Sequence, residues 1–325
     1  MAMLDMIWLV SVFAVSAAVV WLSLHQGWAW RLAVDVPNSR SSHSLPTPRV
    51  GGLLVMPWVL LGAAILTAKI TLLSMAAVLV VISFADDKFG LPVVVRLLAH
   101  LLLSALAAVE IGAFGLLPLL LLTLVIAWMT NLFNFMDGAD GLAGGMAVFG
   151  FGTYAVAALY VGDLLTAQFS LCVVSGMLAF LLFNFPPAKI FLGDAGSISL
   201  GFLAAVLGLL GWQSGSWSFW FPLLVFSPFI VDATVTLLRR ALRGERVWQA
   251  HREHSYQKLM QIGWSHRKTA LAEYGLMATM AVLALALLHV ERWVVLIVLS
   301  IVAMMYALII VAIDVKWRHF QHVAR

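Results

Sequence analysis

Residues 114–130, Phe-Gly-Leu-Leu-Pro-Leu-Leu-Leu-Leu-Thr-Leu-Val-Ile-Ala-Trp-Met-Thr, lead directly into Asn131-Leu-Phe-Asn-Phe-Met-Asp-Gly-Ala-Asp-Gly-Leu-Ala-Gly-Gly145. The first part predicts a membrane-spanning helix, which needs about 20 mostly apolar residues. The second part places two carboxylates and two carboxamides at the edge of the hydrocarbon, where polar groups are costly and usually functional. The stretch therefore predicts a helical membrane protein whose chemistry lies at one membrane surface.

The rest of the chain shares this apolar character. Of the 325 residues, 63% are hydrophobic and only 10% are charged, whereas a typical soluble domain is about 25% charged. A soluble surface cannot be built from this composition, but lipid tolerates it. We expect one integral membrane domain over residues 1–325. The single cysteine, Cys172, excludes a disulfide framework and a cysteine-based metal site.

About eleven apolar stretches reach or approach the length of a span. The fold class that they predict is all-α, a polytopic transmembrane helical bundle. The expected spans are residues 4–24, 50–67, 70–85, 93–112, 114–130, 142–161, 164–185, 197–212, 217–237, 270–289 and 293–314.

The basic residues predict the orientation of this bundle. If the N-terminus lies outside, all of the 19 Lys and Arg residues except Lys69 and Arg292 fall on one side. The positive-inside rule makes that side cytoplasmic and places the C-terminus there too. The same bias accounts for the net charge of +4, so the sequence indicates no nucleic-acid partner.

The expected inner connections hold nearly all of the residues suited to chemistry, whereas the outer connections are short. We expect the inner loops to form the active site, and these are residues 25–49, 86–92, 131–141, 186–196 and 238–269.

Six aspartates are expected at this inner face. Clustered carboxylates repel one another unless protons or a cation neutralise them, and Mg²⁺ commonly joins one or two carboxylates to substrate phosphates. Each aspartate alone could be a helix cap or an ordinary turn residue, but six on one face favour a functional cluster. They are Asp86, Asp87, Asp137, Asp140, Asp194 and Asp232.

Other inner segments could bind phosphate. Glycine-rich residues 137–145 and 193–197 precede expected spans, and a helix N-terminus offers free N–H groups to phosphate. In the late loop, His251 and His254 are three residues apart, on one face of a helix. That pair could bind zinc, hold phosphate oxygens or meet anionic lipid head groups. The first inner loop, residues 35–52, is rich in turn formers and predicts a binding loop.

Five motifs occur in a specific order along nearly the whole chain. They are Pro37-Asn-Ser-Arg-Ser-Ser-His43 with Pro46-Thr-Pro-Arg-Val-Gly-Gly52, then Asp86-Asp-Lys88, then Asn131 to Ala143, then Asn184-Phe-Pro-Pro-Ala-Lys-Ile-Phe-Leu-Gly-Asp-Ala-Gly-Ser197, and finally His251-Arg-Glu-His254. This set resembles the polyprenyl-phosphate N-acetylhexosamine-1-phosphate transferases of the MraY, WecA and WbpL type. The first and last motifs are most similar to the WbpL branch, which initiates O-antigen synthesis. The MraY enzymes instead have three consecutive histidines in the late loop.

The resemblance implies a reaction and its partners. The enzyme would transfer N-acetylhexosamine 1-phosphate from a UDP-sugar to undecaprenyl phosphate, giving undecaprenyl-diphospho-sugar and UMP. The reaction would take place at the cytoplasmic face of the bacterial inner membrane. It would initiate O-antigen, lipopolysaccharide or a related cell-envelope glycan. The resemblance also implies Mg²⁺, with Mn²⁺ as a substitute, and allows a homodimer.

The resemblance also assigns roles to residues. Asp194, with Asp86 and Asp87, would hold the metal, and either Asp86 or Asp87 would deprotonate or orient the lipid phosphate. The nucleotide-sugar would contact Asn131, Asn134, Asp137, Asp140, Asn184 and Phe191, with Phe191 stacked on the uracil. Phosphate groups would contact His43, Arg49, His251, Arg252 and His254. Direct attack by the lipid phosphate is favoured over a covalent aspartyl-phosphate.

Two other classes compete with this interpretation. A secondary transporter could use the inner-face carboxylates as a proton or substrate relay. Transporter sites, however, lie near the bilayer midplane between paired half-repeats, and no such repeats are evident here. A CDP-alcohol phosphotransferase would also use membrane-face aspartates with Mg²⁺, but its characteristic spacing of aspartates is absent.

Overall fold

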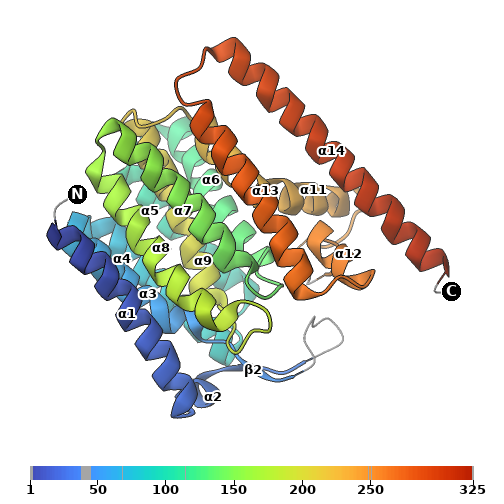
Figure 1. The fold of residues 1–325 in the computed structure, drawn as a ribbon, viewed down its shortest axis with the longest axis horizontal. Helices are drawn as coiled ribbons and strands as arrows, with labels where there is room; N and C mark the ends of the chain where they lie inside the picture. Colours follow the sequence, from blue (N-terminus) through green and yellow to red (C-terminus); the bar gives the residue numbers. More distant parts are fainter. Residues whose placement is uncertain are drawn as a thin grey trace.

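The computed structural model describes residues 3–37, 45–67, 69–113, 115–247, 249 and 251–323. These residues form the predicted all-α bundle, together with one two-stranded antiparallel ribbon (Figure 1). The helices are α1 (Met3–His25), α2 (Trp28–Leu32), α3 (Gly51–Thr67), α4 (Ile70–Phe89), α5 (Val93–Glu110), α6 (Leu116–Phe135), α7 (Leu142–Val161), α8 (Leu164–Asn184), α9 (Asp194–Gln213), α10 (Trp220–Val225), α11 (Ser227–Leu242), α12 (Ser255–Gln261), α13 (His266–Ala286) and α14 (Arg292–Val323). The strands are β1 (Val34–Asp35) and β2 (Thr47–Pro48).

Ten of the predicted spans correspond to single helices. Among the described residues, nine helices are long and apolar enough to cross a membrane, namely α1, α4 to α9, α13 and α14. Helix α3 is apolar but shorter, with 17 residues. The polytopic helical bundle is therefore confirmed.

The span predicted at residues 217–237 is wrong as a single helix. The chain forms α10 and α11 instead, with a break at Phe226. Pro228 causes the break because it has no N–H to donate to the carbonyl of Leu224, four residues earlier. The hydroxyl of Ser227 donates to that carbonyl instead, at 2.7 Å.

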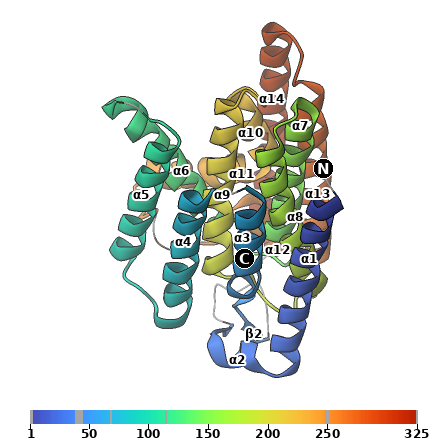
Figure 2. The ribbon, with the colours of Figure 1, turned by 90° about the vertical axis from the view of Figure 1, so that its left-hand side faces the viewer.

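Helix α9 is the centre of the bundle. In the most apolar stretch of α9, 83% of the residues are buried, whereas only 17% are buried in the corresponding stretch of α14 at the edge of the bundle. Figure 2 shows α9 among α3, α4, α7 and α8, and α6 packs against it as well. Glycines make this close packing achievable, since a side chain at Gly201 would collide with the backbone of α6. A rigid, central α9 is well suited to fix a site at its N-terminus.

Several helices extend into segments that were predicted as inner loops. Helix α4 continues to Phe89, α6 continues to Phe135, and α9 begins at Asp194. Asp86, Asp87, Asn131 and Asn134 therefore lie on the last turns of helices. Aspartates at a helix C-terminus oppose the helix dipole, but arginines and backbone amides from other segments bind these carboxylates, as described below.

Candidate active site

The first turn of α9 is the meeting point of three predicted inner segments. The carboxylate of Asp194 is buried, with 5% of its side chain exposed, and it forms an ion pair with Arg49. A second guanidinium nitrogen, on Arg96 of α5, lies 3.8 Å from the other carboxylate oxygen of Asp194. Asp194 thus lies between two arginines that are remote from it in sequence.

Asp87 holds the start of α9 in place. Its two carboxylate oxygens accept backbone N–H groups of Asp194, at 3.2 Å, and of Ala195, at 3.3 Å. Arg49 Nε lies 3.1 Å from the same carboxylate. Only 1% of the Asp87 side chain is exposed. The first amides of α9 are therefore bonded to Asp87, so the expectation that this N-terminus offers them to phosphate is wrong for these two groups.

The neighbouring Asp86 has different partners. One oxygen accepts the N–H of Leu91 at 2.7 Å, and the other lies 2.6 Å from Arg96. Arg96 therefore joins Asp86 to Asp194. The result is one cluster of three carboxylates and two guanidiniums, which neutralises most of its own charge.

Close backbone packing brings these segments together. Gly51 and Gly52 at the start of α3 donate to the carbonyls of Phe191, at 2.9 Å, and Leu192, at 2.7 Å. Gly193 has a φ of +73°, and a side chain there would lie 2.8 Å from the Asp87 carboxylate. Only glycine satisfies both the positive φ and this close approach. Phe191 is partly exposed beside this junction, and its stacking on uracil stays a prediction.

The two asparagines of α6 face neighbouring helices. Asn131 Oδ1 lies 3.1 Å from the ring nitrogen Nδ1 of His100 on α5. Asn134 Oδ1 accepts the hydroxyl of Ser197 on α9 at 3.1 Å. Both asparagines are partly exposed at the inner end of α6. Their contact with the nucleotide-sugar stays a prediction.

Asp137 lies just after α6, in the loop before α7. Burial raises the pKa of Asp137 well above the usual carboxyl range; Arg49 opposes this shift, and the negative charges of Asp194 and Asp87 add to it. Asp137 is therefore electrostatically part of the same site, where its proton is easily retained.

Asp140 and Asn184 hold loops together. Asp140 accepts the backbone N–H of Ala188 at 3.0 Å and lies 3.1 Å from His266. Asn184 is 6% exposed; its oxygen accepts the N–H of Gly141 at 2.9 Å, and its nitrogen donates to the carbonyl of Ile190 at 2.9 Å. These two side chains position the walls of the site, and their contact with nucleotide stays a prediction.

The late loop packs onto the loop that follows α6. Tyr256 on α12 donates its hydroxyl to the carbonyl of Phe135 at 3.2 Å. Asp232 of α11 accepts the backbone N–H of Ser255 at 2.7 Å and so fixes the start of α12. The predicted inner segments 131–141 and 238–269 are thus brought together.

The rings of the two late-loop histidines are in contact, tilted against each other, and neutral. Their rings are 4.8 Å apart, and His254 is 2% exposed. Burial lowers the pKa of His254, and burial next to His254 and Arg240 lowers the pKa of His251 to about 4. At neutral pH these imidazoles can donate hydrogen bonds to phosphate but carry no positive charge. Arg252 lies beside them in the loop, and His43 lies outside the described residues.

Two contributors to the site were not predicted. Arg96 contacts both Asp86 and Asp194, and His266 contacts Asp140. Each is a charged or titratable residue in the first turn of a span at the inner face, and this position was the only signal in the sequence.

The donor set fits a metal held by few protein ligands. Among the described residues no group of three His, Cys, Asp or Glu side chains is close enough to form a cage. Mg²⁺ commonly binds through one or two carboxylates and takes its other ligands from substrate phosphates and water. Asp194, whose carboxylate is bound by side chains only, is the carboxylate in the cluster best placed for this.

An apolar cavity of about 450 Å³ opens between α6, α9, α10 and α11. Aromatic and aliphatic side chains line it, including Trp128, Trp212 and Phe219. Met129 also lines it and lies two residues before Asn131 on α6. The cavity therefore lies along the apolar parts of α6 and α9, whose inner ends carry Asn131 and Asp194.

The fold and the site define a polytopic membrane protein with a buried carboxylate–arginine cluster at one end. Residues 69–211 match the model of glycosyl transferase family 4. The chain is 34% identical, over 80% of its length and 79% of the relative's, to a Bacillus subtilis (strain 168) protein named probable undecaprenyl-phosphate N-acetylglucosaminyl 1-phosphate transferase. The chain belongs to glycosyl transferase family 4.

Two further relatives carry related names. Decaprenyl-phosphate N-acetylglucosaminephosphotransferase of Mycobacterium tuberculosis (strain CDC 1551 / Oshkosh) is 29% identical over 74% of this chain and 72% of its own. Phospho-N-acetylmuramoyl-pentapeptide-transferase of Listeria welshimeri is 34% identical over 47% of each chain. All three names describe transfer of a phosphosugar; two of them name N-acetylglucosamine and the third names an N-acetylmuramoyl pentapeptide.

Proposed function

We propose that this protein transfers N-acetylhexosamine 1-phosphate from a UDP-sugar to undecaprenyl phosphate, giving undecaprenyl-diphospho-N-acetylhexosamine and UMP. It would do so at the cytoplasmic face of a bacterial inner membrane, with Mg²⁺ bound. The product would initiate O-antigen, lipopolysaccharide or a related cell-envelope glycan. The general reaction rests on the named activities of its relatives.

One observation carries the proposal: Asp194 and two arginines meet at the buried start of α9. Both substrates of this reaction are phosphates, so their mutual repulsion must be offset. Arg49 and Arg96 supply fixed positive charge, and 36% and 31% of their side chains remain exposed, so they can reach an incoming anion. Their binding to Asp194 and Asp86 orients both guanidiniums before substrate arrives.

The apolar cavity supports a lipid acceptor. A polyprenyl chain is a hydrocarbon, and the cavity offers it an aromatic and aliphatic surface between α6 and α10. Because α6 continues from Met129 in the cavity wall to Asn131 and Asn134, a lipid held there would carry its phosphate toward the Asp194 cluster.

The expected chemical step is a direct displacement. An oxygen of the lipid phosphate bonds to the sugar-linked phosphorus of the donor, the diphosphate bond breaks, and its electrons leave with UMP. Arg49 and Arg96 would hold the reacting phosphates, and Asp87 would keep Asp194 in position through the α9 backbone. His251 and His254, being neutral, would serve as hydrogen-bond donors to the diphosphate.

Mg²⁺ would be held by Asp194 together with phosphate oxygens. When bound, it would neutralise the negative charge that develops on the diphosphate. Asp86 and Asp87 are less available as ligands because backbone amides and arginines already occupy them.

The test is a reconstituted reaction. Membranes containing the protein are incubated with undecaprenyl phosphate, Mg²⁺ and a panel of UDP-N-acetylhexosamines, and UMP is measured together with lipid-linked sugar. We expect both products from at least one donor and neither product from Asp194→Asn. Uptake of an unchanged donor into vesicles without UMP release would refute the proposal and favour a transporter.

A further inference from the structure

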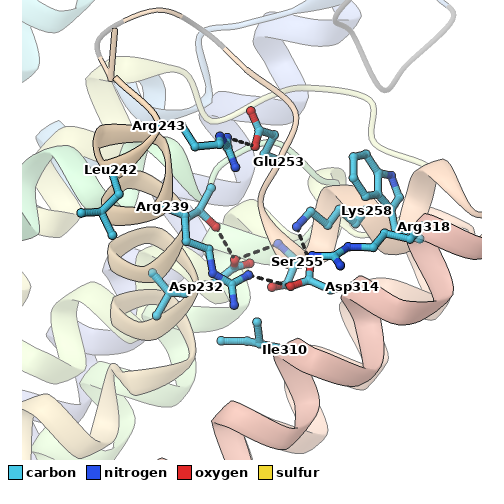
Figure 3. A pocket seen from close by; sticks show the side chains of 13 residues that line it. Asp232, Arg239, Leu242, Arg243, Glu253, Ser255, Lys258, Ile310, Asp314 and Arg318 are labelled. Carbon is cyan, nitrogen blue, oxygen red and sulfur yellow. Dashed lines mark hydrogen bonds and ion pairs between the residues drawn. The ribbon is translucent and has the colours of Figure 1, made fainter. Parts of the chain in front are cut away.

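A second, charged cavity lies between α11, α12 and α14 and has a volume of about 400 Å³ (Figure 3). It is separated from the candidate active site by α12 itself. Tyr256 of α12 points toward the loop after α6, where it bonds to Phe135, whereas Ser255 and Lys258 line the cavity. The cavity is therefore a distinct site on the far side of α12.

The sequence of α14 sets the depth of this cavity in the membrane. Residues 293–313 carry no charged side chain, and the first charge after them is Asp314. Asp314, Trp317 and Arg318 line the cavity. Tryptophan and basic residues at the end of an apolar helix are typical of the lipid head-group layer. The cavity consequently lies where head groups lie.

The walls of the cavity are amphipathic. Val235, Leu242 and Ile310 form its apolar part. In the polar part of the wall, cationic side chains outnumber carboxylates. The cations are Arg239, Arg243, Lys258 and Arg318, and the carboxylates are Asp232, Glu253 and Asp314.

Each carboxylate already has partners within the protein. Asp314 lies 2.6 Å from Arg239 and 2.6 Å from Lys258. Glu253 lies 2.5 Å from Arg243, and Asp232 accepts the N–H of Ser255. No carboxylate in the described part of the chain forms an ion pair with the fourth cation, Arg318.

Arg318 is therefore the cation left over in this cavity. Its side chain extends from α14 into the cavity, toward Asp314 and Ser255 (Figure 3). The arrangement leaves one surplus positive charge at head-group depth, with apolar side chains on the membrane side. A ligand with one negative charge and an adjoining hydrocarbon chain complements it.

We propose that this cavity binds the phosphate head group of an anionic membrane phospholipid, such as phosphatidylglycerol. The head-group phosphate meets Arg318 and the exposed edge of Arg239, and the first part of an acyl chain lies against Ile310 and Leu242. The lipid bridges α14 and α11, and α12 is tied to the same cluster through Lys258. This site is independent of the sugar-phosphate transfer proposed above.

The experiment measures binding of fluorescent phosphatidylglycerol to the purified full-length protein in neutral detergent. Competitors are unlabelled phosphatidylglycerol, phosphatidylcholine, inorganic phosphate and undecaprenyl phosphate. Arg318→Gln is the test variant. Lys316→Gln is the matched control, because it removes the same charge from the same exposed end of α14 but outside this cavity.

We expect saturable binding that unlabelled phosphatidylglycerol displaces and phosphatidylcholine does not. Arg318→Gln should weaken it about fivefold, the factor for one basic residue near an anionic lipid surface, while Lys316→Gln leaves it unchanged. An equal loss of affinity in both variants would show that only the surface charge matters, and it would overturn the proposed site. Displacement by inorganic phosphate alone, or by undecaprenyl phosphate at the lowest concentration, would assign the cavity to another phosphate and also overturn the proposal.

Discussion

Replacing Asp87 by Asn tests whether this carboxylate positions α9 or acts as a base. The side chain keeps its shape but loses its charge and one acceptor. In the native protein its two oxygens accept the N–H groups of Asp194 and Ala195. In the variant the amide nitrogen faces one of these donors, so one buried N–H at the start of α9 is left without an acceptor.

The energetic cost follows from these contacts. An unsatisfied buried donor costs about 1–3 kcal/mol, and the lost ion pair with the partly exposed Arg49 adds up to about 1 kcal/mol. We therefore expect the free energy of unfolding to fall by about 1–4 kcal/mol, which lowers the melting temperature by roughly 2–6 °C in a chain of this size. Because Asp194 shifts with the start of α9, turnover should fall by about 100-fold, as for a displacement of about 1 Å.

The assay compares thermal unfolding and turnover of the purified protein in one detergent. Asp86→Asn is the control, since Asp86 bonds to Leu91 and Arg96 in the α4–α5 connection and not to α9; it should destabilise the protein less. If Asp87→Asn melts like the native protein but loses all activity, the positioning argument fails, and Asp87 acts directly on substrate.

Three other predictions concern the site. Asp194→Asn should abolish turnover with nearly native thermal unfolding, because Arg49 and Arg96 keep Asp87 and Asp86 as partners; native activity would remove the proposed metal role. Excess chelator should stop the reaction, and added Mg²⁺ should restore it, whereas full activity in chelator would contradict the cation requirement. The pKa of His251 is lowered to about 4 by burial and by the neighbouring His254 and Arg240. A bound diphosphate would raise the pKa of His251. Donor affinity should therefore weaken as the pH rises from about 4 to the pKa of His251 in the donor complex, by up to about tenfold per pH unit. His251→Gln should abolish this slope, and equal slopes in both proteins would place the diphosphate elsewhere.

The spans were predictable because length and apolarity dominate the energetics of a membrane helix. Ten expected spans match single helices for this reason. The break at Phe226 was also visible in the sequence, since Pro228 lies inside the expected span of residues 217–237. There a local covalent restriction outweighed the apolar pattern.

Helix ends at the inner face were less predictable. Helix α4 continues through Asp86 and Asp87 because Arg49 and Arg96 neutralise them. Arg49 is remote in sequence, and Arg96 is ten residues from Asp86 but on the next helix. The one local signal was Gly90, whose positive φ of 68° ends the helix as a C-terminal glycine typically does. Long-range partners decided these boundaries, so composition alone placed them too early.

The motifs predicted most of the residues of the site, but they did not predict which of these residues bond to one another. Arg49 and Asp194 are separated by 145 positions, and no periodicity indicates that they touch. Arg96 was counted only as a basic residue of the inner face. Its two carboxylate contacts depend on how α5 packs against α4, which the sequence does not state.

The inner-face aspartates divide by what binds their oxygens. Asp87 accepts amides of α9, Asp140 accepts an amide of the loop before α9, and Asp232 accepts amides of α12. These carboxylates fix one segment to another, so part of the family motif is a folding constraint. No described backbone amide donates to Asp194, and Arg49 and Arg96 bind its carboxylate through side chains that can move. A change of partners at Asp194 would therefore leave the fold intact, as the proposed binding of substrate and metal requires, and this makes Asp194 the carboxylate best suited to the proposed chemistry.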